Sequence, residues 1–422
     1  MALETAITEV YRRVEANTRN PVFIHLVPKD KALERAREVE KMPRNLPLWG
    51  KAFAVKDNID VAGLPTTAAC KGFAYDAKKT AFAVEKVLAA GAILIGKTNM
   101  DQFATGLSGM RSPFGSVRNA FDPAYISGGS SSGSAVAVAL GLVDFALGTD
   151  TAGSGRVPAA FNGLVGLKPS RGRVSNSGVV PACRSLDCVS VFATTCAEAL
   201  RVLRVMEGFD ENDPFSRHAQ EVAINKPPFR FGVPAHPEFF GDSGYARLFA
   251  QAIVRLRSLG GTPVEVDFAP FREAGDLLYG PWLAERYADL EKHLGDMLPV
   301  TRQIIEQGAK GSAADLFRGQ HRLAQLRRVA RAAFRGMDVL AVPSAPTIYK
   351  LADMDAKPIE LNARLGTYTT FVNLLDLTAI TLPAGLREDG LPFGITLIGP
   401  VFTDAALAAL GARFCKEPEI RL

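Results

Sequence analysis

The chain has 422 residues, of which 47% are hydrophobic and 22% charged, as expected for a folded protein that buries a large core. Its net charge of +5 is too small for this length to indicate a nucleic-acid-binding surface. The five cysteines are scattered and form no CxxC pair, so we expect neither a disulfide framework nor a zinc ribbon. Composition thus predicts a cytoplasmic protein with reduced thiols, without a metal or other cofactor.

No segment has the pattern of a secretory signal or of a membrane span. The first 19 residues are amphipathic, and Glu4, Glu9 and Arg12 interrupt the apolar core that a secretory signal needs. Elsewhere Gly, Pro or a charged residue breaks each apolar run before it reaches about 20 residues. We therefore expect a soluble protein with no membrane partner.

Apolar runs of strand length alternate with helical patterns through most of the chain, which predicts an α/β fold. In the first half, these patterns predict helices at 81–90 and 134–142, strands at 92–95 and 143–147, and loops at 106–132. From residue 229 onward, they predict strands at 229–233 and 264–268 and a helix at 245–259. The same alternation on both sides of the middle favours one continuous sheet.

A long helical pattern then interrupts the alternation between residues 274 and 336, with a break near 308–311. We interpret it as a helical insert that covers the sheet. Its basic part, 321–335, has apolar residues at helical spacing, which favours a surface helix with a solvated basic face over a polyanion site. Strands at 339–342, 379–382 and 393–398 and a helix at 404–414 complete one domain spanning 1–422.

A Gly/Ser loop at 127–134 leads directly into an apolar helix. Backbone N–H groups at such a position can bind an anion, so a phosphate site is one interpretation. No GxxxxGK[ST] motif is present, and the lysine that a P-loop needs is missing. A non-catalytic anion-binding protein stays an alternative from another functional class.

A second glycine-rich turn, Gly148–Arg156, follows the next expected strand. Ser154 is flanked by glycines, so its hydroxyl can be exposed on a tight turn. The neighbouring amides can converge on one point as an oxyanion hole, formed by Thr151, Ala152, Gly153 and Ser154. For this motif alone a plain turn is the alternative. Asp150 and Arg156 are expected to brace the turn rather than to contact a substrate.

A serine nucleophile needs a base, and the five histidines lie far from both glycine-rich loops in the sequence. A histidine-based triad is therefore poorly supported. A lysine can serve instead if burial lowers its pKa and keeps it uncharged. Lys56 stands alone in the apolar stretch 52–56 and is the candidate, although a strand-end lysine that reaches solvent is the alternative.

Lys56 in AVKDNI, Ser130 in the GGSS loop and Ser154 in the DTAGS turn together resemble the amidase signature family. The order of the motifs and the interval between the two serines match the family pattern over almost the whole chain. The resemblance implies an amidase-signature fold, a large central mixed β-sheet covered by helices on both faces. It also implies that Lys56 is the base, that Ser130 follows a cis peptide bond and relays the proton, and that Ser154 attacks.

Within this family the sequence is similar to the allophanate hydrolases, which deaminate urea-1-carboxylate in urea and s-triazine breakdown. The similarity rests on four features, namely 109–115, the serines at 130–132, Ala152 and the block 181–190. It implies a small anionic amide as substrate, bound by Gly109, Tyr279 and Arg286, and it is compatible with a homodimer. A carboxylate suits the planar guanidinium of an arginine.

Other members of the family share the three motifs. An amidase subunit of a tRNA-dependent amidotransferase or a broad-specificity amidase is therefore the alternative enzyme. Many allophanate hydrolases also carry a further C-terminal domain, which this sequence is expected to lack.

Overall fold

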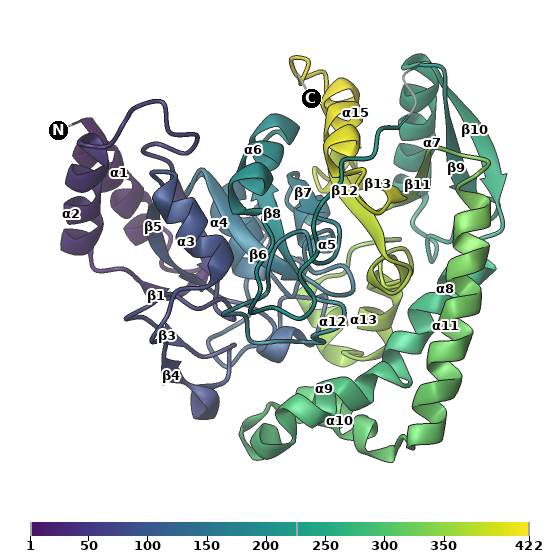
Figure 1. Ribbon diagram of the computed structural model, residues 1–422, viewed down its shortest axis with the longest axis horizontal. Helices are drawn as coiled ribbons and strands as arrows, with labels where there is room; N and C mark the ends of the chain where they lie inside the picture. The colour runs from purple at the N-terminus through teal and green to yellow at the C-terminus, as the bar shows by residue number, and fades with distance from the viewer. Residues whose placement is uncertain (1, 225–226, 421–422) are drawn as a thin grey trace.

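An eleven-stranded mixed β-sheet forms the centre of the computed structural model, which describes residues 2–224 and 227–420 (Figure 1). The strand order is β1-β5-β2-β6-β8-β7-β12-β13-β11-β9-β10. The strands are β1 (Phe23–Leu26), β2 (Ala52–Lys56), β5 (Ile93–Thr98), β6 (Phe145–Asp150), β7 (Val165–Lys168), β8 (Cys188–Ala193), β9 (Phe229–Pro234), β10 (Gly261–Val266), β11 (Val339–Pro343), β12 (Leu377–Leu386) and β13 (Pro392–Pro400). Two short strands, β3 (Pro65–Thr66) and β4 (Tyr75–Asp76), pair separately.

Parallel pairing occurs in two places, where β2 lies between β5 and β6 and where β9 lies between β10 and β11. The pairs between these two parallel parts are antiparallel, and so is the pair of β1 with β5. Because strand β2 is internal, the side chain at its end, Lys56, is placed deep in the molecule. This mixed sheet confirms the predicted fold class.

Helices cover both faces of the sheet (Figure 1). The helices are α1 (Ala2–Ala16), α2 (Lys29–Glu40), α3 (Phe82–Ala89), α4 (Ser132–Ala139), α5 (Val157–Phe161), α6 (Cys196–Met206), α7 (Ser243–Ser258), α8 (Ala269–Asp276), α9 (Trp282–Leu290), α10 (Pro299–Ile305), α11 (Ala313–Ala333), α12 (Leu351–Ala356), α13 (Glu360–Leu365), α14 (Phe371–Leu374) and α15 (Asp404–Cys415). Side chains alternate across β2, so that Phe53 and Val55 join the core under α3, α6, α7 and α15. Ala52 and Ala54 point to the opposite core, under α1, α2 and α4.

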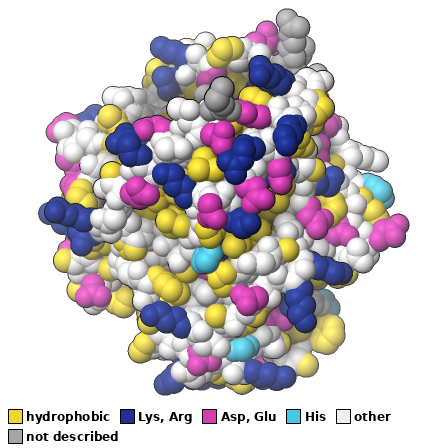
Figure 2. Space-filling model, turned by 90° about the vertical axis from the view of Figure 1, so that its left-hand side faces the viewer, with side chains coloured by type: hydrophobic (Ala, Val, Ile, Leu, Met, Phe, Trp, Pro, Cys, Tyr) yellow, Lys and Arg dark blue, Asp and Glu magenta, His cyan; other side chains and the backbone are white. Residues whose placement is uncertain are grey.

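The helical stretch between β10 and β11 consists of α8 to α11, and its expected break coincides with a 3-10 turn at Glu306–Lys310. In Figure 1, α11 runs along one side of the molecule, with α9 and α10 at its lower end. Leu323, Leu326 and Ala330 of α11 are buried, while most of its basic residues face outward, as predicted. Figure 2 shows another face of the molecule, the left-hand side of Figure 1, where basic and acidic side chains are interspersed.

Several strands extend beyond their predicted ends, and β5, β6 and β12 do so by three or four residues. Strand β5 continues past residue 95 to Thr98, because residues 96–98 pair with β2. Strand β6 begins two residues later than predicted and continues to Asp150, because 148–150 pair with β8. Helix α4 begins at Ser132 rather than residue 134. Small and polar residues in these segments hid the pairing from a reading based on apolar runs. In the described ranges, no helix is both long and apolar enough to cross a membrane.

Asp404, the first residue of α15, fixes this helix to the sheet. Its buried carboxylate accepts hydrogen bonds from the Ser170 backbone N–H at 2.7 Å and from the Thr378 hydroxyl at 3.0 Å. It also pairs with the buried Arg173 guanidinium at 3.1 Å. Removing one partner of a buried ion pair leaves an uncompensated charge, so this junction is sensitive to mutation.

We expect Asp404→Ala to lower the free energy of unfolding by about 3 to 5 kcal/mol, because the buried Arg173 loses its only fully buried partner among the described residues. Chemical denaturation followed by circular dichroism measures this change. Glu221→Gln is the control, because the Glu221 side chain also pairs with Arg173 but is 49% exposed, and its loss should cost about 1 kcal/mol or less. If both substitutions lowered the free energy of unfolding equally, the burial of Asp404 would not explain the stability of this junction.

Candidate active site

Lys56 lies at the end of β2 with its side chain completely buried. Its Nζ atom lies 2.7 Å from the Ser130 hydroxyl and 2.6 Å from the Thr149 hydroxyl. Each hydroxyl can accept a hydrogen bond from the amine or donate one to it, depending on its protonation. The lysine therefore does not reach solvent, and the alternative of a strand-end surface lysine is wrong.

Burial lowers the pKa of Lys56 to about 7, because an ammonium loses its hydration in the interior. Three carboxylates, Asp101, Asp187 and Asp150, favour the charged form and limit this shift, whereas the positive charge of Arg286 adds to it. A substantial fraction of the amine is consequently uncharged at neutral pH. An uncharged buried amine beside a hydroxyl can act as a general base.

Ser130 precedes Ser131, the N-cap residue of α4, and its peptide bond with Gly129 is cis, as the family resemblance implies. The Ser130 carbonyl accepts a hydrogen bond from the Asp101 backbone N–H at 3.0 Å. The next residue, Ser131, donates from its hydroxyl to the Thr149 carbonyl at 3.1 Å. These contacts tie the Gly/Ser loop to β6, so that the Ser130 hydroxyl faces Lys56.

The turn after β6 is built around a buried ion pair. Asp150 accepts two hydrogen bonds from Arg156, at 2.8 and 2.9 Å, and one each from the backbone N–H groups of Gly153 and Gly155, both at 2.9 Å. Burial opposes ionisation of Asp150, but Arg156 outweighs it, and the pKa falls below its ordinary value. Both residues brace the turn, as predicted.

Gly153 is required by the shape of this turn. Its φ is +130°, and a Cβ atom there would lie 2.4 Å from the Thr369 hydroxyl. The Gly153 amide already donates a hydrogen bond to Asp150 at 2.9 Å. One of the four amides predicted to form an oxyanion hole is therefore already hydrogen-bonded within the turn. The amides of Thr151, Ala152 and Ser154 belong to the same turn.

Ser154 is 3% exposed and lines a cavity of about 340 Å³. In the part of the chain that the structure describes, its hydroxyl has no hydrogen-bond partner. The turn therefore presents an unengaged hydroxyl to the cavity, whereas the Ser130 hydroxyl is hydrogen-bonded to Lys56.

The cavity beside Ser154 is positively charged. Two buried guanidinium groups line it, Arg286 of α9 and Arg111, and the described lining contains no carboxylate. Arg286 donates to the Thr105 hydroxyl at 2.9 Å, and Arg111 donates to the Thr105 carbonyl at 2.8 Å. The remaining lining is mostly apolar or neutral. Such a cavity favours an anion of small size.

Tyr279 also lines the cavity and is the most exposed of the three predicted substrate-binding residues, at 45%. Burial raises the pKa of Tyr279, and the charges of Arg286 and Arg111 oppose this shift. The hydroxyl thus stays protonated and is available as a hydrogen-bond donor near both guanidinium groups.

Gly109 is not part of the described lining of this cavity. Its φ is +79°, and a Cβ atom would lie 2.5 Å from the Ser127 hydroxyl and 2.7 Å from the Gly128 carbonyl. Its N–H donates to the Asp101 carboxylate at 3.0 Å. These contacts explain why the position requires glycine, and substrate contact at Gly109 stays a prediction.

Asp187 contacts the turn that carries Ser154 through Thr151. It is fully buried, and its carboxylate accepts hydrogen bonds from the Thr151 hydroxyl at 2.5 Å and from the backbone N–H groups of Ala182 and Cys183, at 2.8 and 3.1 Å. Burial raises the pKa of Asp187 to about 6, and these hydrogen bonds limit the shift. Asp187 therefore positions Thr151 in the turn that carries Ser154.

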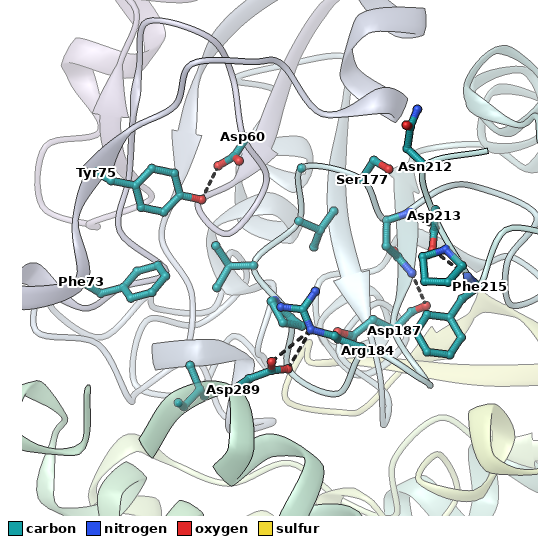
Figure 3. A pocket seen from close by; sticks show the side chains of 17 residues that line it. Asp60, Phe73, Tyr75, Ser177, Arg184, Asp187, Asn212, Asp213, Phe215 and Asp289 are labelled. Atoms are coloured by element: carbon teal, nitrogen blue, oxygen red, sulfur yellow. Dashed lines mark hydrogen bonds and ion pairs between the residues drawn. The ribbon is translucent and has the colours of Figure 1, made fainter. Parts of the chain in front are cut away.

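A second cavity of about 390 Å³ lies beyond Asp187 (Figure 3). Several acidic side chains line it, namely Asp60, Asp187, Asp213 and Asp289, and Arg184 pairs with Asp289 at 3.0 Å. Its described lining includes none of the predicted catalytic residues. Although this cavity is larger, the first one adjoins Ser154.

A family comparison agrees with this geometry. The model of the Amidase family matches residues 5–408. The chain belongs to the amidase family.

Individual amidase relatives are similar over most of this chain. It is 45% identical to the urea amidolyase of Saccharomyces cerevisiae over 404 residues, which cover 93% of this chain but 22% of that protein. A solved structure of the Kluyveromyces lactis allophanate hydrolase superposes with a TM-score of 0.93 at 41% identity, covering 98% of this chain and 70% of that one. A glutamyl-tRNA(Gln) amidotransferase subunit of Symbiobacterium thermophilum is 34% identical over 98% of this chain and 93% of its own length. This chain thus spans about a fifth of the urea amidolyase.

The described residues of this amidase include one group that could hold a metal ion. The Cys196, Cys415 and Glu417 ligand atoms lie within 4.8 Å of one another. The Glu417 carboxylate already accepts hydrogen bonds from the Cys196 N–H, at 2.9 and 3.0 Å, and so caps the N-terminus of α6. Glu417 therefore has a structural role that does not depend on a metal.

Sequence reasoning missed four residues that complete this amidase site, namely Asp101, Arg111, Thr149 and Asp187. Thr149 lies in the same turn motif as Ser154, but only the strand register shows that its hydroxyl faces Lys56. Arg111 and Asp187 lie in blocks that were singled out as distinctive, without a role for either residue. For Arg111 and Asp187, the signal available in the sequence was a charged residue among small or apolar neighbours.

The pKa of Lys56 leads to a prediction that needs no substrate. The rate at which a fluorophosphonate modifies Ser154 should rise with pH and level off above a midpoint near 7, because only the uncharged amine can accept a proton. Labelling for fixed times between pH 5.5 and 9, quantified on gels, measures how the rate depends on pH. Lys56→Met is the control and should label slowly at every pH. A rate that does not change between pH 6 and 8 would exclude Lys56 as the base.

Proposed function

We propose that the chain is an allophanate hydrolase, which hydrolyses urea-1-carboxylate with release of ammonia and carbon dioxide through an acyl-enzyme intermediate. The observation that carries this proposal is the cavity beside Ser154, where two guanidinium groups face no carboxylate in the described lining. The similarity to the yeast urea amidolyase and allophanate hydrolase supports the same substrate. The substrate is a small molecule, and neither a nucleic acid nor a membrane is needed.

The proposed proton path runs from Ser154 through Ser130 to Lys56. Uncharged Lys56 accepts the proton of Ser130, and Ser130 accepts that of Ser154 as its oxygen attacks the amide carbon. The proton returns along the same path to the amide nitrogen when the C–N bond breaks and ammonia leaves. Water then attacks the acyl-enzyme with the same groups as base and acid, and N-carboxycarbamate is released. Carbon dioxide forms afterwards, when this product decarboxylates.

Charge that develops on the carbonyl oxygen is stabilised by the amides of the turn at 151–154, with the Gly153 amide shared with Asp150. The carboxylate of the substrate is bound by Arg286, with Arg111 and the Tyr279 hydroxyl close by. An arginine can form two parallel hydrogen bonds with a carboxylate, which fixes the orientation of a planar substrate. The amide end then lies toward Ser154.

The alternative enzyme is an amidase subunit of a tRNA-dependent amidotransferase or a broad amidase. The similarity to the glutamyl-tRNA(Gln) amidotransferase protein of Symbiobacterium thermophilum, at 34% identity, favours it. Lys56, Ser130 and Ser154 would have the same roles in that enzyme. A non-catalytic anion-binding protein is the alternative from another class, and it predicts no labelling of Ser154 by a fluorophosphonate.

The purified protein should release ammonia from allophanate much faster than from biuret, malonamate or glutamine. A coupled ammonia assay with all four compounds measures this preference, and Ser154→Ala should reduce the rate by at least about 10³-fold because the nucleophile is lost. No allophanate turnover by wild-type protein would refute the proposal. Glutamine-dependent activity that requires partner subunits would favour the amidotransferase.

Arg286→Gln should raise KM for allophanate by about 10²-fold, because a charge-assisted bidentate contact is replaced by a neutral amide. Steady-state kinetics measure the change. Fluorophosphonate labelling of Ser154 should differ little from that of the wild type when it is measured above pH 8, where Lys56 is mostly uncharged, since the reagent has no carboxylate. A fall in labelling as large as the loss in kcat/KM would show that Arg286 supports the catalytic residues instead.

A further inference from the structure

Glu285, the residue before Arg286 in α9, connects this helix to the segment Cys183–Ser185. Its carboxylate accepts hydrogen bonds from the Ser185 backbone N–H at 2.7 Å, from the Ser185 hydroxyl at 2.6 Å and from the Cys183 thiol at 3.0 Å. Burial raises the pKa of Cys183, and the Glu285 charge adds to this effect, so the thiol keeps its proton and donates it. The carboxylate thus holds three donors from one short segment.

Consecutive residues of an α-helix point in directions about 100° apart, so Glu285 and Arg286 face different surroundings. Glu285 faces the segment Cys183–Ser185, whereas Arg286 reaches the cavity and donates to the Thr105 hydroxyl at 2.9 Å. Helix α9 has nine residues. A contact that fixes the rotation of this short helix at Glu285 also fixes the direction of the Arg286 side chain.

The same segment is bound to the turn of the reactive serine. Asp187, two residues after Ser185, accepts hydrogen bonds from the Thr151 hydroxyl and from the Cys183 N–H. The Cys183 residue therefore contacts Glu285 through its thiol and Asp187 through its N–H. The helix that carries Arg286 and the turn that carries Ser154 are consequently held by one short stretch of chain.

We propose that Glu285 is a positioning residue for substrate recognition, which holds α9 on the segment Cys183–Ser185 so that Arg286 stands at a fixed distance from Ser154. This inference deepens the proposed function and rests on it, because Arg286 is taken to bind a substrate carboxylate. A loss of the Glu285 contacts lets α9 rotate or shift, and the guanidinium then no longer meets the carboxylate while the amide lies at Ser154. A misplacement of about 1 Å is enough to reduce productive binding.

A matched control lies one helical turn farther along α9. Asp289 pairs with Arg184 at 3.0 Å at the surface, where the Arg184 side chain is 57% exposed (Figure 3). Exposed ion pairs contribute little, so Asp289→Asn removes a charged contact between the same helix and the same segment at small cost. Glu285→Gln keeps the size of the side chain but removes its charge and one of the two oxygens that accept from Cys183 and Ser185.

The experiment measures how malonamate, an amide with a carboxylate, protects Ser154 from a neutral fluorophosphonate. In Glu285→Gln the concentration of malonamate that halves the labelling rate should rise about tenfold. The KM for allophanate should also rise about tenfold, whereas kcat should stay within about twofold of the wild-type value. Labelling without malonamate should equal that of the wild type. Asp289→Asn should match the wild type in every measurement.

Unchanged protection in Glu285→Gln would overturn the inference, and so would a tenfold fall in labelling without malonamate, which would indicate general damage to the site. Wild-type protein that malonamate does not protect would also overturn it. Wild-type protein that is protected but does not hydrolyse allophanate would count against the proposed function alone. The melting temperature of each variant identifies protein that is not folded.

Discussion

An amine that is held uncharged in the interior is the constraint on which the rest of this structure depends. A fully buried ammonium would cost several kcal/mol of lost hydration, which lowers the pKa of Lys56 to about 7. That environment requires an internal strand with both faces covered, and β2 lies between two parallel neighbours in a sheet of eleven strands. The position of β2 inside the sheet therefore keeps the amine of Lys56 away from water.

Buried carboxylates organise the loops around this amine. Asp101 accepts from the N–H groups of Gly109 and Arg111, and Asp150 holds the turn of Ser154 together with Arg156. Asp187 fixes Thr151 from the opposite side. Each of these loops has few apolar side chains to pack, so hydrogen bonds to a buried charge replace packing as the source of rigidity. The same three charges keep the pKa of Lys56 from falling further.

The sequence permitted a correct prediction of the fold class, and it brought attention to Lys56, Ser130 and Ser154 because their three motifs together resemble the pattern of the amidase signature family. It could not show that Thr149 contacts the lysine, since that depends on strand register. Nor could it show the second guanidinium in the cavity, because Arg111 and Arg286 lie far apart in the chain. The ends of β5 and β6 were misplaced for a related reason, since polar residues there pair in the sheet without raising local hydropathy.

The groups proposed for bond breaking all come from residues 56 to 154, whereas Tyr279 and Arg286 come from helices inserted between β10 and β11. This separation has an evolutionary consequence. Replacements in the inserted helices can redirect the enzyme to a new amide while Lys56, Ser130 and Ser154 remain unchanged. Divergence within such a lineage should therefore concentrate in that insert, and an engineer seeking altered selectivity would begin there.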